Sequence, residues 1–336
     1  MNYNSFSEED IRPKELFNTY LKLAKEDILN FFTDKENFIE INCPACSSDE
    51  KKLSFIKQGF EYQSCLNCFS LYLSPRPNEY MINLFYKHGA SVKYWSTHFF
   101  KYTSEIRRNK LIKPKANSII ENAKKYLNTN KNLTFCDIGS GYGLLLEEIS
   151  KMNLFRDIFG IEPSPNLAND CRSKGFQIIE KSLEKIEEQE ISVDYATSFE
   201  VLEHLFDPHL FLTSAKKIIK KNGIMQFTTL SCTGFDMQTL WENSDSIYPP
   251  HHINLLSNIG LKILIERAKL KVLDFCTPGK LDLDIVRNAY TKNPSLVSNR
   301  FIKMLCESEP DIRSNFQNFL QENHLSSHVN FVITHL

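Results

Sequence analysis

The stretch Phe135-Cys136-Asp137-Ile138-Gly139-Ser140-Gly141-Tyr142-Gly143 decides the fold of this chain. The apolar run 133–138 is typical of a buried parallel strand, and the leucine-rich residues 144–149 can form the apolar face of a helix. Glycine tolerates unusual dihedral angles and lets the backbone approach a ligand with no Cβ in the way. The stretch therefore predicts half of a βαβ unit whose tight glycine loop contacts a cofactor.

The spacing of the glycines separates two kinds of cofactor loop. A dinucleotide fingerprint needs a third glycine at the position held by Leu144. The pattern Asp-x-Gly-x-Gly-x-Gly instead resembles motif I of the class I S-adenosylmethionine (SAM) methyltransferases. The resemblance implies that this loop meets the amino-acid end of SAM, and a tight turn without a ligand is the alternative. The implied cofactor residues are Asp137, Gly139, Ser140, Gly141 and Gly143.

Further candidate cofactor residues follow in the next βαβ unit. A short apolar run ends at Glu162-Pro163, and a carboxylate at such a strand tip can accept both ribose hydroxyls. A solvated acid at the end of the strand is the alternative. The segment Ser182-Leu183-Glu184 lies where the family contacts adenine, although Ser182 can also be a helix N-cap.

The segment after the fourth expected strand carries a second resemblance to the same family. Strand 193–199 is followed by Glu200-Val201-Leu202-Glu203-His204-Leu205-Phe206-Asp207-Pro208, close to the family pattern "evLEHv-DP". We expect Glu200 at the cofactor cleft and His204 one helical turn beyond it, as a base or as a residue that holds the loop. A helix over 210–220, stopped by Asn222-Gly223, and a strand over 224–230 complete an α/β, Rossmann-like doubly wound sheet.

Four cysteines upstream have the spacing of a zinc site. Two Cys-x-x-Cys pairs, separated by a β-like stretch, can direct four thiolates at one ion: Cys43, Cys46, Cys65 and Cys68. Four protein ligands fill the shell of zinc, which predicts a structural metal. Disulfides need an oxidising compartment, whereas residues 1–10 lack the features of a signal peptide, so we expect a cytoplasmic protein.

The segment Tyr248-Pro249-Pro250-His251-His252 supplies candidate catalytic groups beyond the sheet. It resembles the family branch that reads "PPHHxNxxs". A histidine with a pKa near neutrality can remove a proton as methyl transfer proceeds, so His251 and His252 are candidate bases. The alternative is that one of them caps the helix that begins near Ser257. Tyr94, Trp95 and Tyr248 are candidate acceptor-pocket residues, with packing of a loop as the alternative for Tyr94-Trp95.

Length and composition agree with several modules. We expect a helical segment over 1–40, a zinc module over 41–75, a helical linker or lid over 76–130, a SAM domain over 131–278 and a helical extension over 279–336. The balance of 40 Lys and Arg against 41 Asp and Glu disfavours a nucleic-acid partner. No apolar run is long enough to span a membrane. The oligomeric state stays open.

The whole arrangement resembles zinc-containing class I methyltransferases of bacterial sugar and polysaccharide pathways. The resemblance implies SAM-dependent methyl transfer to a small molecule such as a sugar, a nucleotide sugar or a related precursor. Sugar C-methyltransferases carry a Tyr-His-Glu-His style segment where this chain has Tyr248-Pro249-Pro250-His251-His252, which weakens sugar carbon as the acceptor. The alternatives are a zinc-containing RNA methyltransferase and a non-catalytic interaction protein that keeps the fold.

Overall fold

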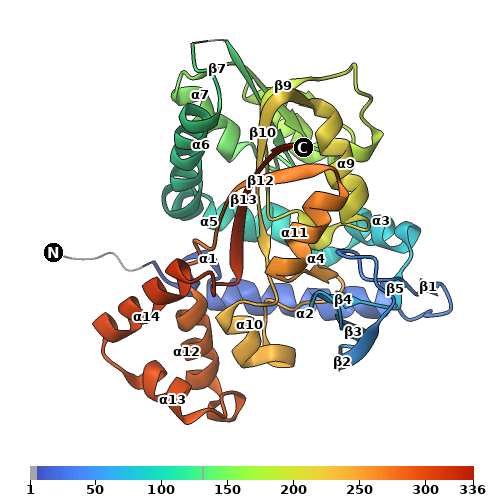
Figure 1. The fold of residues 1–336 in the computed structure, drawn as a ribbon. Coiled ribbons are helices and arrows are strands. Elements are labelled where there is room, and N and C mark those ends of the chain that lie inside the picture. Colours follow the sequence, from blue (N-terminus) through green and yellow to red (C-terminus); the bar gives the residue numbers. More distant parts are fainter. Residues whose placement is uncertain (1–5, 131) are drawn as a thin grey trace. The chain divides into compact units, whose positions relative to one another are not determined.

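The computed structural model describes residues 6–130 and 132–336 (Figure 1). The chain divides into two units. Unit 1 comprises Met1–Ile106, Leu230–Gly260 and Cys276–Val329. Unit 2 comprises Arg107–Thr229, Leu261–Phe275 and Asn330–Leu336. Neither unit is one continuous stretch of chain. The five consecutive segments that the sequence predicts as modules, from 1–40 to 279–336, stay predictions.

Unit 2 is built on a seven-stranded sheet in the order β12-β13-β10-β9-β6-β7-β8. The five strands expected from the sequence pair in parallel, from β8 through β7, β6 and β9 to β10. The strands are β6 Leu133–Ile138, β7 Phe155–Ile161, β8 Gln177–Ile179, β9 Val193–Phe199, β10 Ile219–Leu230, β12 Leu270–Cys276 and β13 His328–His335. The expected α/β, Rossmann-like fold is confirmed.

The helices of this unit cover the sheet because each carries an apolar face. Helix α6 buries Ala116, Ile119 and Ala123 in the same cluster as Phe135 and Tyr195 of the sheet. Its Pro114 is the second residue of α6 and follows helical backbone at Ile112. The helices are α6 Lys113–Tyr126, α7 Leu144–Lys151, α8 Pro165–Ser173, α9 Pro208–Ile218 and α11 Asn258–Arg267, with the π-helix η2 Arg108–Ile112 before α6.

Two expectations about secondary structure were wrong. Helix α9 ends at Ile218, and the residues expected to stop it lie inside β10, where the pairing with β9 shifts register between Ile219 and Ile224. Ile219 is buried against the sheet, so the strand starts early. The C-terminal extension is helical only over α12 Asp282–Lys292, α13 Arg300–Glu307 and α14 Pro310–Glu322. Its last part is β13, whose residues 329–333 are buried.

Unit 1 contains a four-stranded antiparallel sheet in the order β11-β4-β3-β2. The strands are β2 Lys51–Lys57, β3 Phe60–Cys65, β4 Leu71–Leu73 and β11 Asn254–Leu255, and β1 Phe38–Ile39 pairs separately with β5 Arg76–Pro77. Strand β11 directly follows the two histidines, so pairing with β4 places that segment on the cysteine-bearing sheet.

The helices of unit 1 come from three parts of the chain. They are α1 Glu8–Ile11, α2 Lys14–Phe31, α3 Glu79–His88, α4 Ala90–Tyr94, α5 Phe100–Arg107 and α10 Phe235–Leu240, together with the π-helix η1 Trp95–Phe99 and the three C-terminal helices. Helices α3 and α10 bury side chains in one apolar cluster with Phe60, Tyr62 and Leu255 of the sheet. Helices α12 and α13 bury theirs in a second cluster with Leu240. Within the described residues, no helix is both long and apolar enough to cross a bilayer.

Candidate functional site

The glycine loop joins β6 to α7 and has positive φ at Gly139, Gly141 and Gly143, at 78°, 53° and 72°. A Cβ on Gly139 would lie 2.9 Å from the Val201 side chain, and one on Gly143 would lie 2.9 Å from Cys171 Sγ. A Cβ on Gly141 would meet nothing within 4 Å. The loop therefore packs tightly at both ends and leaves open space beside its middle glycine, where a ligand can approach the backbone.

The carboxylate of Glu162 is held against this loop from the tip of β7. Its Oε2 accepts a 2.8 Å hydrogen bond from the N–H of Gly141, and its Oε1 accepts one of 2.9 Å from the N–H of Ser164. The side chain is 6% exposed, and burial raises its pKa while the two N–H groups oppose that rise. A carboxylate oxygen has two acceptor sites, so each oxygen can also accept a ribose hydroxyl. The neighbouring Pro163 is exposed.

Asp137 is tied to the neighbouring strand. It lies opposite Thr197 in the β6–β9 register and accepts a 2.7 Å hydrogen bond from the Thr197 hydroxyl. Burial raises the pKa of Asp137 to about 7, opposed by that bond and by the charge of Lys115. An ammonium group brought nearby would favour the charged carboxylate. Glu162 and Asp137 thus place two buried carboxylates beside the glycine loop, where they could accept hydrogen bonds from hydroxyl or ammonium groups.

Glu200 lies at the end of β9 in a left-handed backbone conformation, with φ at 57°. Its Oε1 accepts a 2.5 Å hydrogen bond from the Thr228 hydroxyl and lies 3.3 Å from Lys115 Nζ. Lys115 Nζ also sits 4.5 Å from the centre of the Phe199 ring. Neither Lys115 nor Thr228 belongs to a recognisable motif, so the sequence alone does not mark them as candidates.

Glu203 is a further residue that the sequence analysis did not select. It lies in the short 3₁₀ helix η4 Leu202–His204, is 1% exposed, and accepts a 2.7 Å hydrogen bond from the Thr229 hydroxyl. Burial and the nearby charge of Glu200 raise its pKa to about 8. His204 Nε2 lies 4.0 Å from Glu203 Oε1. The expected α-helical turn from Glu200 to His204 is wrong, because the left-handed Glu200 precedes only one 3₁₀ turn.

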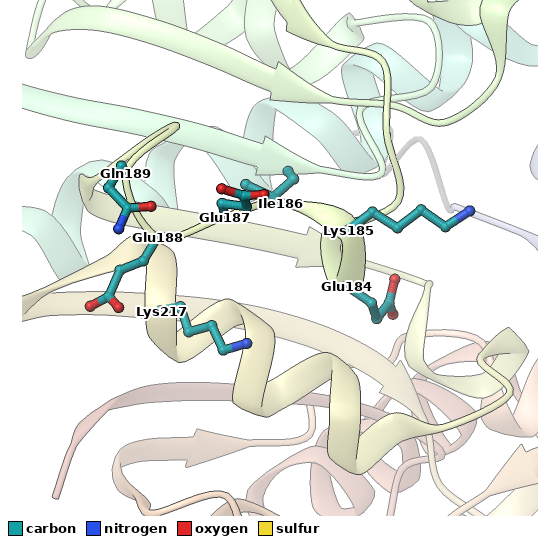
Figure 2. Close-up of a pocket in the computed structure, with 7 residues that line it drawn as sticks. All are labelled: Glu184, Lys185, Ile186, Glu187, Glu188, Gln189 and Lys217. Atoms are coloured by element: carbon teal, nitrogen blue, oxygen red, sulfur yellow. The ribbon is translucent and has the colours of Figure 1, made fainter.

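The proposed adenine contacts lie at the 3₁₀ helix η3 Leu183–Lys185. Ser182 is its N-cap without a side-chain capping bond, and Leu183 is 3% exposed. A surface hollow of about 400 Å³ lies beside this helix, and Figure 2 shows its lining, six consecutive residues from η3 and the loop after it together with Lys217 of α9. It is lined by Glu184, Lys185, Ile186, Glu187, Glu188, Gln189 and Lys217. Of these residues only Glu184 belongs to the segment expected to contact adenine, and the charged lining does not suit an adenine ring.

The four predicted metal-ligating cysteines converge in unit 1. Their sulfur atoms all lie within 4.8 Å of one another, and Cys43–Cys68 and Cys46–Cys65 are each separated by 3.5 Å. These separations exceed a disulfide bond of about 2.05 Å. Four thiolates bound tetrahedrally to zinc at about 2.3 Å lie roughly 3.8 Å apart, so the donor set and its spacing fit zinc.

The two cysteine pairs share one backbone turn. Ser47 and Phe69, each directly after a pair, have φ of 65° and 63°. Their N–H groups donate to the carbonyls of Cys43 and Cys65, at 2.8 and 3.0 Å. The repeated turn aims both sulfurs of each pair at the same point.

The two candidate histidines lie in unit 1 in different surroundings. His252 is half-buried, and its Nδ1 is 2.6 Å from the carbonyl oxygen of Ser246. A carbonyl only accepts, so Nδ1 carries a proton and the lone pair of a neutral His252 is on Nε2. The backbone is fixed as well, since the His252 N–H donates to Tyr248 O and the Tyr62 hydroxyl donates to His252 O. His251 is 7% exposed and surrounded by aromatic rings.

The aromatic residues expected in an acceptor pocket pack within the same unit. Trp95 stacks on Phe99 with 4.2 Å between ring centroids, and Tyr94 stacks on His98 at 5.3 Å. Both rings belong to the junction of α4 with the π-helix η1. The Tyr248 hydroxyl donates to the carbonyl of Leu21 in α2. These contacts agree with the alternative that Tyr94 and Trp95 only pack against neighbouring side chains. That the segment 76–130 acts as a lid stays a prediction.

The glycine loop and the strands around it match a known protein family. The model of a family described as a methyltransferase domain matches residues 107–274, half of the 336-residue chain. The chain belongs to this methyltransferase-domain family. The matched residues include the glycine loop, Glu162 and the segment from Glu200 to His204. The expected enzyme class is confirmed at the level of the family.

Individual relatives cover less of the chain. A ubiquinone biosynthesis O-methyltransferase of Azorhizobium caulinodans is 31% identical over 109 residues, which are 31% of this chain and 42% of the relative. One of a Bradyrhizobium species is 31% identical over 116 residues, 33% of this chain and 45% of the relative. The chain thus spans less than half the length of these curated relatives. The plantazolicin methyltransferase BpumL, solved with SAH, is 14% identical with a TM-score of 0.48, covering 76% of this chain and 94% of that one. A likeness this distant says nothing about substrate.

Proposed function

We propose that this chain transfers a methyl group from SAM to a small-molecule acceptor. The observation that supports this most is the Glu162 carboxylate, held at 2.8 Å by the Gly141 N–H beside the open space of the glycine loop, in a chain of the methyltransferase-domain family. When bound, SAM supplies an activated methyl group on its sulfonium. The glycine loop and Asp137 would hold the amino-acid part of SAM, and Glu162 would bind its ribose. Leu183 would contact the adenine, and Glu200 would lie at the edge of the cofactor cleft.

The base in this proposal is His252. An acceptor hydroxyl or amine loses a proton as it gains the methyl group, and Nε2 of a His252 protonated on Nδ1 can take it. Alignment of the acceptor can contribute about 7 to 11 kcal/mol, and a general base a further factor of roughly 10² to 10⁴. His204 is the rival base, with the buried Glu203 beside it.

For the acceptor, we propose a hydroxyl-bearing small molecule, with sugars and nucleotide sugars first. The cysteine pairs ahead of the SAM domain support the sugar class through their resemblance to sugar-pathway enzymes, while the Pro-Pro-His-His segment departs from the sugar C-methyltransferases and argues against carbon as the methylated atom. The relatives named above are O-methyltransferases of ubiquinone biosynthesis, which favours oxygen as the methylated atom and makes phenolic compounds the second group to test. The cytoplasmic location and the place in polysaccharide synthesis stay predictions from the sequence.

The four cysteines would hold one structural zinc in this proposal. All four ligands come from the protein, which leaves no position for an activated water. The site joins the loop after β1 to the β3–β4 turn and so closes the small sheet. Its role would be to stabilise unit 1 rather than to take part in the reaction.

Isothermal titration with SAM and S-adenosylhomocysteine, on protein whose zinc content is assayed, tests the proposal. Binding of one equivalent by wild type, lost in Glu162→Gln and kept in the exposed control Glu188→Gln, supports it. A screen with methyl-labelled SAM against nucleotide sugars, phenols and RNA then separates the acceptor classes. Folded, zinc-loaded protein that binds neither ligand would leave the non-catalytic alternative.

A further inference from the structure

His251 is linked to two buried residues that are far from it in sequence. We propose that Asp27, Ser91 and His251 form a positioning relay that fixes one tautomer of His251 and so holds the backbone of its neighbour His252. The proposal deepens the proposed function, because it rests on His252 as the base. It assigns positioning roles to Asp27 and Ser91, which no sequence motif marks.

The relay begins at Asp27, which is 1% exposed on α2. Its Oδ1 accepts a 2.8 Å hydrogen bond from the N–H of Ala90, and its Oδ2 accepts one of 2.8 Å from the N–H of Ser91. These are the first N–H groups of α4, whose N-cap is Gly89 and has no side chain to satisfy them. Asp27, on α2, thus caps α4. The two N–H groups compensate the buried charge of the Asp27 carboxylate and fix the orientation of that side chain.

The second member is Ser91, which is fully buried. Its hydroxyl donates a 2.5 Å hydrogen bond to Asp27 Oδ2. A hydroxyl has one hydrogen, so Ser91 Oγ can only accept from any further partner. His251 Nε2 lies 3.5 Å away, at the outer limit of a hydrogen bond. If Ser91 Oγ accepts, His251 Nε2 must donate and so carries the proton. The lone pair of the neutral His251 ring is then on Nδ1.

Aromatic rings restrict the third member. The His251 ring lies edge-on to Phe85 at 4.9 Å between centroids, 5.5 Å from Tyr20 and 6.1 Å from Tyr248. A ring enclosed in this way on α2, α3 and the histidine segment has little freedom to rotate. Packing and the relay therefore act on His251 together.

The consequence falls on His252. Its Nδ1 donates to Ser246 O, so the two neighbouring histidines carry their protons on opposite nitrogens. His251 is a donor held inside the unit, while His252 has its lone pair on Nε2. The peptide that joins them is thus fixed on one side by the relay and on the other by Ser246 and Tyr62. Loss of Ser91 would loosen this peptide and misplace Nε2 of His252.

Two-bond ¹H–¹⁵N correlation spectra of the full chain labelled at histidine nitrogen test the relay. In wild type we expect His251 protonated on Nε2 and His252 on Nδ1 at neutral pH. In Ser91→Ala we expect His251 to lose its single tautomer, and in Asp27→Asn to shift in the same direction. The matched control is Thr103→Val, which removes another buried hydroxyl of unit 1, one that donates to Phe99 O. It should leave both histidine spectra unchanged.

Kinetics provide the second measurement. We expect Ser91→Ala to lower kcat roughly tenfold to hundredfold, as for a misplaced catalytic group, with the Kd for SAM unchanged. A wild-type His251 protonated on Nδ1 would overturn the relay even if neither variant folds, and so would a Ser91→Ala variant with unaltered tautomers and kcat. The spectra need neither SAM nor acceptor, so a relay seen in a protein without turnover would reject the proposed function alone.

Discussion

Glu162 Oε2 and the backbone nitrogen of Gly141 are joined by a 2.8 Å hydrogen bond between the tip of β7 and the glycine loop. The bond orients a carboxylate that is 6% exposed and aims it beside the only loop glycine whose Cβ position is open. The proposed ribose acceptor and the backbone proposed to meet the amino-acid part of SAM are thus joined directly. A substitution at Glu162 or at Gly141 should therefore alter the position of the other residue.

We expect Gly141→Ala to impair SAM binding more than stability. Alanine at a φ of 53° costs about 1 to 2 kcal/mol, and its Cβ would meet no protein atom within 4 Å. The methyl group would instead occupy the side where we place the cofactor, and we expect SAM affinity to fall roughly tenfold, about 1.4 kcal/mol. Titration calorimetry and urea unfolding measure the two effects.

Gly175→Ala is the matched control for this change. Gly175 also has positive φ, at 90°, and open space at its Cβ, but it follows α8 outside the candidate site. We expect a similar or greater loss of stability with unchanged SAM affinity. Equal losses of affinity in both variants would mean that Gly141 acts only through the fold.

Glu203 should make the protein less stable as pH rises. Burial and the charge of Glu200 raise its pKa to about 8, above the ordinary value in the unfolded chain. The folded state therefore holds this proton more tightly, and its contribution is complete below pH of about 4 and lost as pH rises through about 8. Asp137, with a pKa raised to about 7, acts in the same direction.

Glu203→Gln removes this titration while keeping an acceptor for Thr229. We expect its Tm to exceed that of wild type by at least about 2 °C at pH 9, and the difference to shrink or reverse at pH 4.5. Thermal unfolding across this range measures it. A constant Tm difference at every pH would show that folding does not raise the pKa of Glu203.

Loss of the cysteine site should affect unit 1 and spare SAM binding. Strand β4 follows the second cysteine pair and pairs with β11, which follows the histidines. The proposed SAM residues all lie in unit 2. We expect zinc chelation or Cys65→Ser to increase hydrogen exchange over 51–73 and 252–257 and to lower kcat, with the Kd for SAM within about threefold of wild type. The exposed Cys276→Ser is the control, and unchanged exchange would contradict a structural metal.

The sequence predicted the features that depend on short spacing. Strand, loop and helix over 133–149 follow from local hydrophobicity and glycine dihedrals, and the Cys-x-x-Cys pairs carry their own turns. It could not predict contacts made only by the tertiary fold. Ser91 meets Asp27 across 64 residues and His251 across 160, and Lys115 meets Glu200 across 85.

Two errors have a physical cause of the same kind. The buried run 329–333 is short and follows three helices, so its β-branched residues alone are weak evidence for a strand. Pairing within the sheet stabilises the strand, and the sequence does not show that pairing. Asn222-Gly223 is a normal helix stop, yet the burial of Ile219 against Val193 begins the strand before it. In both places the sheet overrides a local preference.

His252→Ala should separate chemistry from cofactor binding. Nε2 is the nitrogen that can accept a proton, since Nδ1 donates to Ser246 O. The residue lies in unit 1, far in sequence from the glycine loop of unit 2 where we propose that SAM binds. We expect kcat to fall by a factor of roughly 10² to 10⁴ with the Kd for SAM unchanged. His209→Ala, on α9, is the control and should keep both values. Single-turnover kinetics of all three proteins, with the acceptor found in the screen, measure the effect. Unchanged turnover in His252→Ala would remove His252 as the base and make His204 the residue to test next, because its ring lies beside the buried Glu203.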